Sequence, residues 1–302
     1  MVFARNVYVW LVPFMILILT LAVIGNGLIV ISSPWLSHPI SPYHRLCVSL
    51  AAADTWAASL VVTGLIVNSY MPVVFGIHKR TECLAAFLEI FRISGMLTSN
   101  LHICALTILQ FVGIVYPLQY KAILTAKRQR LLIFFLWAVP LMFIFIWFIA
   151  TPNDGLRHPN CKLTFYGQLP FRLSVFVSFI VPLLATFALY GNILFTLLKE
   201  KAKCWNDLRR SMPDNHRRRV KSNLKLVWTT LLILSTFTFS WGVCVLYFVL
   251  VCNDGCVFIY RYSITFRVGF LISSTVNFLV MHFYKAVVAS VLALQTMDFI
   301  IQ

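Results

Sequence analysis

The sequence contains few charged residues, and the acidic ones are the scarcest. Only 11% of its 302 residues are Asp, Glu, Lys or Arg, and Asp and Glu together number 9. A typical soluble domain carries about 25% charged residues, whereas 60% of this chain is hydrophobic. The composition therefore excludes an ordinary soluble protein and indicates one that is embedded in a membrane.

Sequence patterns of the common catalytic sites are also missing. There is no His-Glu-x-x-His zinc motif, no nucleophile-elbow turn and no phosphate-binding glycine loop. No lysine lies within the apolar body of segment 262–284, so a retinal Schiff base there has no anchor. No Asn-x-Ser/Thr acceptor for N-linked glycans occurs either. We expect a protein that is neither an enzyme nor a photoreceptor and that carries no cofactor beyond a structural ion.

What the chain does contain is seven long apolar segments. Roughly 20 apolar residues suffice to cross a bilayer as a helix, and the bilayer interior leaves no partner for backbone groups outside a helix or a closed barrel. The chain therefore predicts an all-α membrane protein, a single domain built as a seven-transmembrane helix bundle. The expected spans are 8–31, 44–68, 83–111, 131–151, 171–198, 223–251 and 262–284, and residues 285–302 form a short cytoplasmic tail.

The net charge of +16 is distributed unevenly between the two sides of this bundle. Sixteen basic residues lie on one side, in or beside the loops that join spans one to two, three to four and five to six, and after span seven. Eight basic residues lie on the opposite side. Basic residues favour the cytoplasmic side, so the amino terminus is expected outside. This placement favours a topology signal with contact to anionic membrane lipid, and it argues against nucleic acid as the partner.

The cysteines also divide by side. Cys83 and Cys161 are both expected to face an oxidising compartment, where a disulfide can persist. Cys252 and Cys256 share the connection before span seven, and their spacing permits a small second bridge, with a metal site as the alternative.

Polar residues inside the spans are few and therefore informative. Asn26 lies in span one, and Asp54 is the only acidic residue in the middle of any span. With these residues the chain resembles the rhodopsin-like (class A) family of G-protein-coupled receptors over nearly its whole length, as a divergent member without an identified ligand. The residues that carry the resemblance are Asn26; Asp54; Cys83 with Cys161; Tyr116-Pro117-Leu118; Trp137; Pro182 with Tyr190; Phe237 with Trp241; and Ser273, Ser274 and Asn277.

The resemblance implies roles for these residues. It implies a disulfide between Cys83 and Cys161, and a switch made of Trp241, Phe237, Tyr190 and Pro182 that relays ligand contact into movement of the sixth helix, with ordinary packing as the alternative for Trp241. It also implies a polar pocket that holds a sodium ion at rest, or else a hydrogen-bonded cluster without an ion. The candidates for that pocket are Asp54, Asn26, Ser99, Ser273, Ser274 and Asn277.

Three departures from the family pattern lie in its activation machinery. Leu109-Gln110-Phe111 stands where the family has Asp/Glu-Arg-Tyr, Val243 replaces the helix-six proline, and Asn277-Phe278-Leu279-Val280-Met281 lacks the Pro and Tyr of the helix-seven motif. Gln110 carries no charge, although it can still hydrogen-bond Tyr190. The residues expected to face a G protein are Gln110, Phe111, Pro117, Arg217, Arg218 and Arg219.

The candidates for the ligand pocket are charged residues in the outer halves of the spans: Glu89, Arg92, Arg172 and Arg267. A cluster of these cations would favour a carboxylate, a phosphate or an acidic peptide. The preferred alternative is that Glu89 pairs with Arg92 while Arg172 and Arg267 extend toward lipid headgroups. The sequence thus predicts a plasma-membrane receptor for an extracellular ligand that signals through a heterotrimeric G protein. The alternative is a receptor-like protein without coupling, which scavenges, traffics or scaffolds.

Overall fold

The structure of the chain is a computed structural model. It describes residues 2–35, 42–76, 82–116, 120 and 125–206, together with five positions of span six: Val227, Leu231, Leu234, Ser235 and Thr238. Within these residues all regular structure is helical. Five helices are long and apolar enough to cross a membrane, in agreement with the first five predicted spans.

The first two spans form an adjacent pair of long helices. Helix α1 runs over Val2–Ser32 and ends in a short 3-10 turn at Ser33–Trp35, and α2 runs over Pro42–Gly64. A π-helical turn (Leu65–Tyr70) and the short helix α3 (Met71–Phe75) continue α2 beyond its predicted end at 68. Gly76 then takes a left-handed conformation with φ 66°, which is a common way for a helix to stop.

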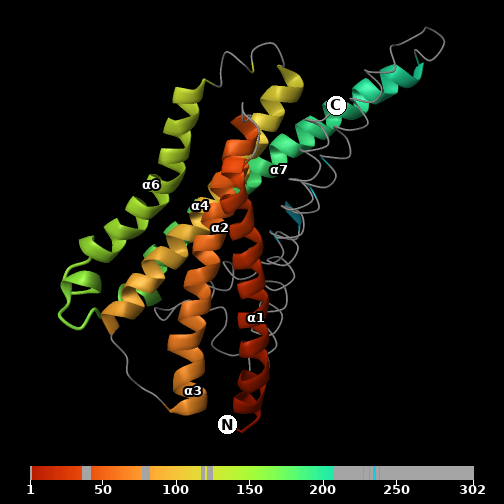
Figure 1. Cartoon of the computed structure of the whole chain (residues 1–302). Helices are drawn as coiled ribbons and strands as arrows, with labels where there is room; N and C mark the ends of the chain where they lie inside the picture. Colours follow the sequence, from red (N-terminus) through yellow and green to blue (C-terminus); the bar gives the residue numbers. More distant parts are fainter. Residues whose placement is uncertain are drawn as a thin grey trace.

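The next three spans are single long helices: α4 (Glu82–Val115), α6 (Ala126–Ala150) and α7 (Leu169–Asn206). Helix α6 begins five residues before its predicted start at 131. The prediction missed the first turn because this turn is built from polar residues, which a search for apolar segments leaves out. Thr125 caps this turn by accepting a hydrogen bond from the Arg128 amide at 3.4 Å. Helix α7 likewise continues past the apolar run, and in Figure 1 its end projects beyond the other helices.

Helix α4 is the centre of the described bundle. It packs against α2, α6 and α7, while α1 packs against α2 (Figure 1). All eight residues from Ile93 to Asn100 are buried, so α4 is enclosed on every side in its middle turns. A helix buried all round lies inside a bundle rather than at its edge. At about 1.5 Å per residue, the 34 residues of α4 extend for about 50 Å from one end of the bundle to the other.

The connection from α6 to α7 is a folded loop at the end of the bundle where α4 begins. Cys83 at the start of α4 is disulfide-bonded to Cys161 in this loop, as the resemblance implies. Phe148, Phe165 and Phe171 pack edge to face beside it and are almost completely buried. We call this end the disulfide end, and the opposite end, where Gln110 lies, the Gln110 end.

Candidate functional site

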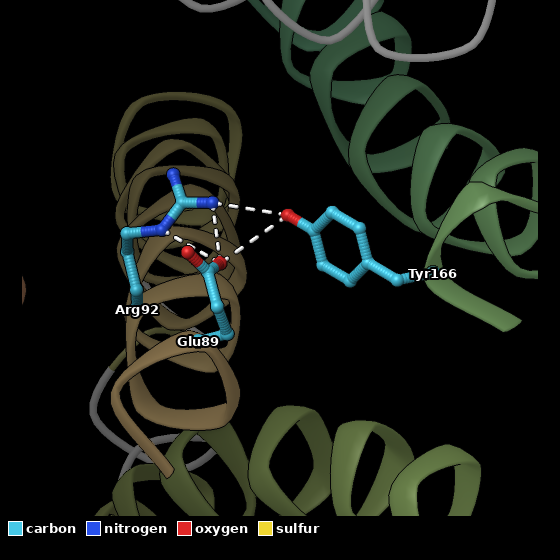
Figure 2. Close-up of polar contacts among 3 residues, drawn as sticks. All are labelled: Glu89, Arg92 and Tyr166. Atoms are coloured by element: carbon cyan, nitrogen blue, oxygen red, sulfur yellow. Dashed lines mark hydrogen bonds and ion pairs between the residues drawn. The ribbon is translucent and has the colours of Figure 1, made fainter. Parts of the chain in front are cut away.

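Three groups of polar side chains lie along α4, one at each end and one in the middle. The group at the disulfide end consists of Glu89, Arg92 and Tyr166. Arg92 Nε donates to Glu89 Oε2 at 2.9 Å, and Arg92 Nη2 donates to the Tyr166 hydroxyl at 3.1 Å. That hydroxyl lies 3.2 Å from the same Glu89 oxygen, to which it donates. Figure 2 shows the three side chains pointing toward one another, two from α4 and one from the loop.

This arrangement contains the pairing of Glu89 with Arg92 that one of the two interpretations expects. Arg92 is paired with Glu89, so the two side chains together carry no net charge. Burial of Tyr166 and the nearby Glu89 charge raise the pKa of its hydroxyl well above the ordinary value, so the group stays protonated and can donate. The Glu89 carboxylate is thus already paired within this group.

Arg172 differs from the prediction that it extends toward lipid headgroups. Its Nε donates to the backbone carbonyl of Tyr166 at 2.9 Å, which ties the first turns of α7 to the loop. The cation therefore helps to place Tyr166 over α4. Arg267, the fourth ligand-pocket candidate, lies outside the described residues.

The loop itself is held by Asp154, a residue that sequence analysis did not single out. Its carboxylate accepts hydrogen bonds from the amides of Gly155, Thr164 and Phe165 at 3.0, 3.1 and 2.7 Å and from the Thr164 hydroxyl. Burial acts to raise the pKa of Asp154, but these bonds outweigh burial and leave the pKa below its ordinary value. Gly155 must be glycine, because its φ is +62° and a Cβ there would lie 2.3 Å from the Phe148 carbonyl oxygen.

The middle group contains two of the predicted sodium ligands. Ser99 Oγ on α4 donates to Asp54 Oδ1 on α2 at 2.7 Å, and the two residues are 4% and 5% exposed. Asn26 is also buried, and its Nδ2 donates to the Ala22 carbonyl of its own helix at 3.0 Å. The structure thus joins Asp54 with Ser99, whereas the Asn26 amide bonds within α1.

A second chain of hydrogen bonds joins α4 to α2 and α6 close to this pair. The Trp137 indole on α6 donates to Ser49 Oγ on α2 at 3.1 Å, and Ser49 Oγ lies 2.8 Å from His102 Nε2. His102 Nδ1 lies 2.8 Å from the Thr98 carbonyl, to which it must donate, and in the neutral form of the ring Nε2 accepts from Ser49. His102 is 0% exposed. This histidine is a packing group that joins three helices.

Helix α7 is joined to α4 beside the predicted proline. Pro182 has no amide hydrogen, so the helix loses one internal bond in this turn. Asn100 Nδ2 on α4 donates to the nearby carbonyl of Phe179 at 2.8 Å. The Asn100 side chain thus satisfies one carbonyl in the turn before the proline.

At the Gln110 end one glutamine side chain joins three helices. Gln110 Nε2 on α4 donates to the Tyr43 hydroxyl on α2 at 2.9 Å. The Tyr190 hydroxyl on α7 donates to Gln110 Oε1, also at 2.9 Å. Gln110 is 7% exposed and Tyr190 3%. The bond to Tyr190 was expected from the sequence, whereas the bond to Tyr43 was not. Phe111, the next predicted residue at this end, is partly buried and packs against Tyr116.

A groove of about 310 Å³ opens between α2, α4 and α6 at mid-height. Trp56 and Phe134 on its border are 46% and 62% exposed. The groove contains none of the predicted site residues.

Several predicted site residues lie outside the described part of the chain. They are Pro117, Arg217, Arg218, Arg219, Phe237, Trp241, Cys252, Cys256, Arg267, Ser273, Ser274 and Asn277. The described positions of span six do reach the core: Val227 and Leu234 are buried in the same cluster as Tyr190 and Ile193 of α7.

Comparison with known proteins agrees with this arrangement. Residues 25–294 match the sequence model of the family described as "7 transmembrane receptor (rhodopsin family)". The chain is 26% identical to the thyrotropin-releasing hormone receptor of Mus musculus over 210 residues, which cover 64% of this chain and 52% of that receptor. It is 28% identical to the alpha-1A adrenergic receptor of Oryzias latipes over 186 residues, or 59% of this chain and 37% of that receptor. It is 26% identical to the trace amine-associated receptor 6 of Homo sapiens over 231 residues, covering 73% and 66% of the two chains. The aligned part thus spans between 37% and 66% of the length of these three relatives.

Proposed function

The chain belongs to the rhodopsin family of seven-transmembrane receptors, and from this premise we propose that it binds an extracellular ligand and signals through a heterotrimeric G protein at the plasma membrane. The ligand is not fixed by the relatives, whose names include a hormone receptor, an adrenergic receptor and a trace amine-associated receptor. G-protein signalling is general for the family.

The observation that carries the proposal is that α4 links the two ends of the bundle. One rigid helix bears Glu89 and Arg92 at the disulfide end, Ser99 in the middle and Gln110 at the other end. The first group bonds to the α6–α7 loop, the second to α2, and the third to both α2 and α7, so a shift of α4 relative to its neighbours strains all three groups. A ligand that binds one arrangement of these contacts better than another shifts the population of both ends together.

The proposed orientation places the disulfide end outside the cell. The larger share of basic residues lies on the side of the Gln110 end, as expected for the cytoplasm. The Cys83–Cys161 disulfide lies at the opposite end, where an oxidising compartment would preserve it. In this orientation the ligand meets the Glu89, Arg92 and Tyr166 group, and the G protein meets the Gln110 end.

Nucleotide exchange tests this proposal directly. The full chain is reconstituted in lipid nanodiscs and mixed with a panel of purified G proteins. The uptake of a GTP analogue by each G protein is then measured without added ligand. We expect basal uptake above that of empty nanodiscs with at least one G protein. Uptake equal to that of empty nanodiscs across the panel would contradict coupling.

We extend the proposal to a sodium ion at Asp54. The carboxylate of Asp54 and the hydroxyl of Ser99 are buried oxygen groups in contact, and hard cations prefer such oxygen ligands. When bound, the ion would supply positive charge to a carboxylate that is otherwise costly to bury. Ser273, Ser274 and Asn277 would contribute the remaining oxygens.

The melting temperature in sodium and in choline chloride checks the ion. A ligand that binds only the folded state raises stability with its concentration, by about 2.7 kcal/mol at 100 times its Kd. We expect sodium to raise the melting temperature of the wild-type chain and to leave Asp54→Asn almost unchanged. The same sodium response in both proteins would show that no ion binds at Asp54.

A further inference from the structure

One face of α6 runs from the Gln110 end of the bundle into the groove between α2, α4 and α6. Phe134, Ala138 and Leu141 line the groove. Arg130 and Lys127 come four and seven residues before Phe134, spacings that place side chains on the same face of an α-helix. Both cations are exposed. Two positive charges therefore lie on a helix face that continues into an apolar groove.

Helix α2 repeats this pattern on the other side of the groove. Trp56 lines the groove, and the exposed Arg45 comes eleven residues, or about three turns, before it. Its neighbour Leu46 packs in one cluster with Leu132, which follows Arg130 by two residues, so the two helices meet beside these cations. We call the three cations the basic corner: Arg45, Lys127 and Arg130.

The segments that form the basic corner contain no carboxylate to balance it. Residues 1–53 and 90–153, which include the first turns of α2, all of α6 and most of α4, contain no Asp or Glu. Within the described ranges, Arg45, Lys127 and Arg130 form no ion pair. Their charge is therefore available to an anion from outside these segments.

The groove itself suits a hydrocarbon chain. Two polar groups on its wall bond within the protein: Ser94 Oγ donates to the Phe91 carbonyl at 3.1 Å, and the Trp137 indole donates to Ser49 Oγ at 3.1 Å. Trp56 and Phe91 meet edge to face with their ring centres 5.8 Å apart. The helices around the groove are membrane spans, so the hydrocarbon of the bilayer is what reaches it.

The length of the groove face matches one lipid molecule. From Arg130 to Leu141 helix α6 rises over eleven residues, about 16 Å at about 1.5 Å per residue. One half of the hydrocarbon core of a bilayer measures about 15 Å, which is the depth that a lipid tail reaches below its headgroup. A headgroup at the basic corner therefore places its tail along the groove.

We propose that the basic corner and the groove form one binding site for an anionic phospholipid. Arg45, Lys127 and Arg130 hold the phosphate of its headgroup, and one acyl chain lies between α2, α4 and α6. Guanidinium and ammonium groups bind phosphate through charge-assisted hydrogen bonds. Anionic lipids are found in the cytoplasmic leaflet, so the supply of this lipid in a cell rests on the proposed orientation, whereas the site itself does not.

Native mass spectrometry of the full chain in detergent micelles measures the headgroup preference. Phosphatidylserine and phosphatidylcholine with the same acyl chains are titrated, and the dissociation constants of the first bound lipid are compared. We expect phosphatidylserine to bind more tightly. One basic residue at a membrane surface contributes about a fivefold factor, so Lys127→Gln should weaken phosphatidylserine binding about fivefold and leave phosphatidylcholine binding unchanged. Equal affinities of the two lipids for the wild-type chain would overturn the site.

Lys199→Gln is the matched control for the charge. Lys199 is an exposed lysine of α7 beyond the Gln110 end, and its replacement removes the same charge from another helix. The affinity for phosphatidylserine should stay at the wild-type value. The same loss in Lys127→Gln and Lys199→Gln would show diffuse attraction to a cationic surface and would overturn a defined site.

Ala138→Phe tests the groove. The added ring takes up space between Phe134 and Leu141, so the affinities for both lipids should fall. Ala185→Phe adds the same ring at an exposed position of α7 and should leave both affinities unchanged. The melting temperature of each variant confirms that it is folded. Phosphatidylserine binding that persists at the wild-type affinity in Ala138→Phe would show that the tail lies elsewhere, which overturns the proposal.

Cross-linking of the wild-type chain locates the tail without any substitution. Phosphatidylserine with a diazirine in the middle of one acyl chain is bound and irradiated, and the labelled peptides are identified by mass spectrometry. We expect labels on Trp56, Phe134 or Leu141, and labelling confined to other helix faces would contradict the site. Cholesterol that binds the groove more tightly than phosphatidylserine, with equal affinity in Lys127→Gln, would assign the groove to a sterol and likewise overturn the proposal.

Discussion

Asp154 is the clearest case of a single side chain that organises a whole segment. Its two oxygens accept from three backbone amides and one hydroxyl, and all of these donors lie in the α6–α7 connection. That connection carries Cys161 and Tyr166, so Asp154 indirectly places both the disulfide and the hydroxyl that faces Arg92. The Asn-Asp-Gly sequence around it is a turn signal, and it could have been recognised from the chain alone.

At the residue scale we predict that Asp154→Asn destabilises the receptor in a pH-dependent way. Bonds to a charged acceptor are worth about 1.5–3 kcal/mol, so the melting temperature should fall clearly at pH 7. The folded-state pKa of Asp154 lies below its unfolded value of about 3.9, so its stabilisation is complete above that value and is lost as the pH falls through the folded pKa. The difference between wild type and variant should stay constant from pH 7 to about pH 5 and shrink below about pH 4.

Melting curves in detergent across this pH range measure the effect. Thr164→Ser keeps a hydroxyl donor to Asp154 and should melt close to the wild type. A difference between wild type and Asp154→Asn that persists undiminished to pH 3 would show that the carboxylate charge is not the cause.

At the scale of elements, the close approach of α2 and α4 depends on small side chains. A Cβ added at Gly95 would lie 3.1 Å from the Ala57 Cβ and 3.5 Å from its Cα. Small residues are the usual means by which membrane helices come into close contact. The Ala57 methyl is fixed to the α2 backbone and cannot turn away, so the whole helix would have to move.

We predict opposite effects for two glycine substitutions in membrane helices. Gly95→Ala should lower the melting temperature, because overpacking costs about 1–3 kcal/mol and the gain in helix propensity is only about 1 kcal/mol. Gly27→Ala should leave the melting temperature unchanged or raise it, because nothing lies within 4 Å of the added Cβ. The same increase for both variants would contradict the packing of α2 against α4.

The helices could be predicted from the sequence better than their ends. Hydropathy located all five described spans, because a bilayer requires a long apolar run. It missed the polar first turn of α6 and the continuation of α2 past residue 68 into α3. These extensions depend on capping by Thr125 and on the helix stop at Gly76, which are local features that hydropathy does not report.

The contacts between helices were less predictable than the residues that make them. The resemblance pointed to Asp54, Ser99, Gln110 and Tyr190, and the structure brings them together in two pairs. Tyr43 and Tyr166 gave no signal, because an aromatic residue near a span end is ordinary in a membrane protein. Their roles depend on which turn of a neighbouring helix or loop faces α4, and that information is present only in the packed bundle.

At the scale of the whole molecule, the central helix α4 connects the disulfide end of the described bundle to the Gln110 end. The fold belongs to the rhodopsin family, while Gln110 removes the charge that the family keeps at this position. Gln110 instead joins α2, α4 and α7 through its hydrogen bonds to Tyr43 and Tyr190. Coupling is therefore expected to survive without the arginine.

The comparison of the wild-type chain with Gln110→Arg in nucleotide exchange tests this claim most directly. We predict that the wild-type chain catalyses nucleotide exchange on a G protein above the level of empty nanodiscs. An arginine at position 110 is then not needed for this activity. A wild-type chain that is silent with every G protein, beside a Gln110→Arg variant that is active, would contradict the account and indicate a receptor that has lost coupling.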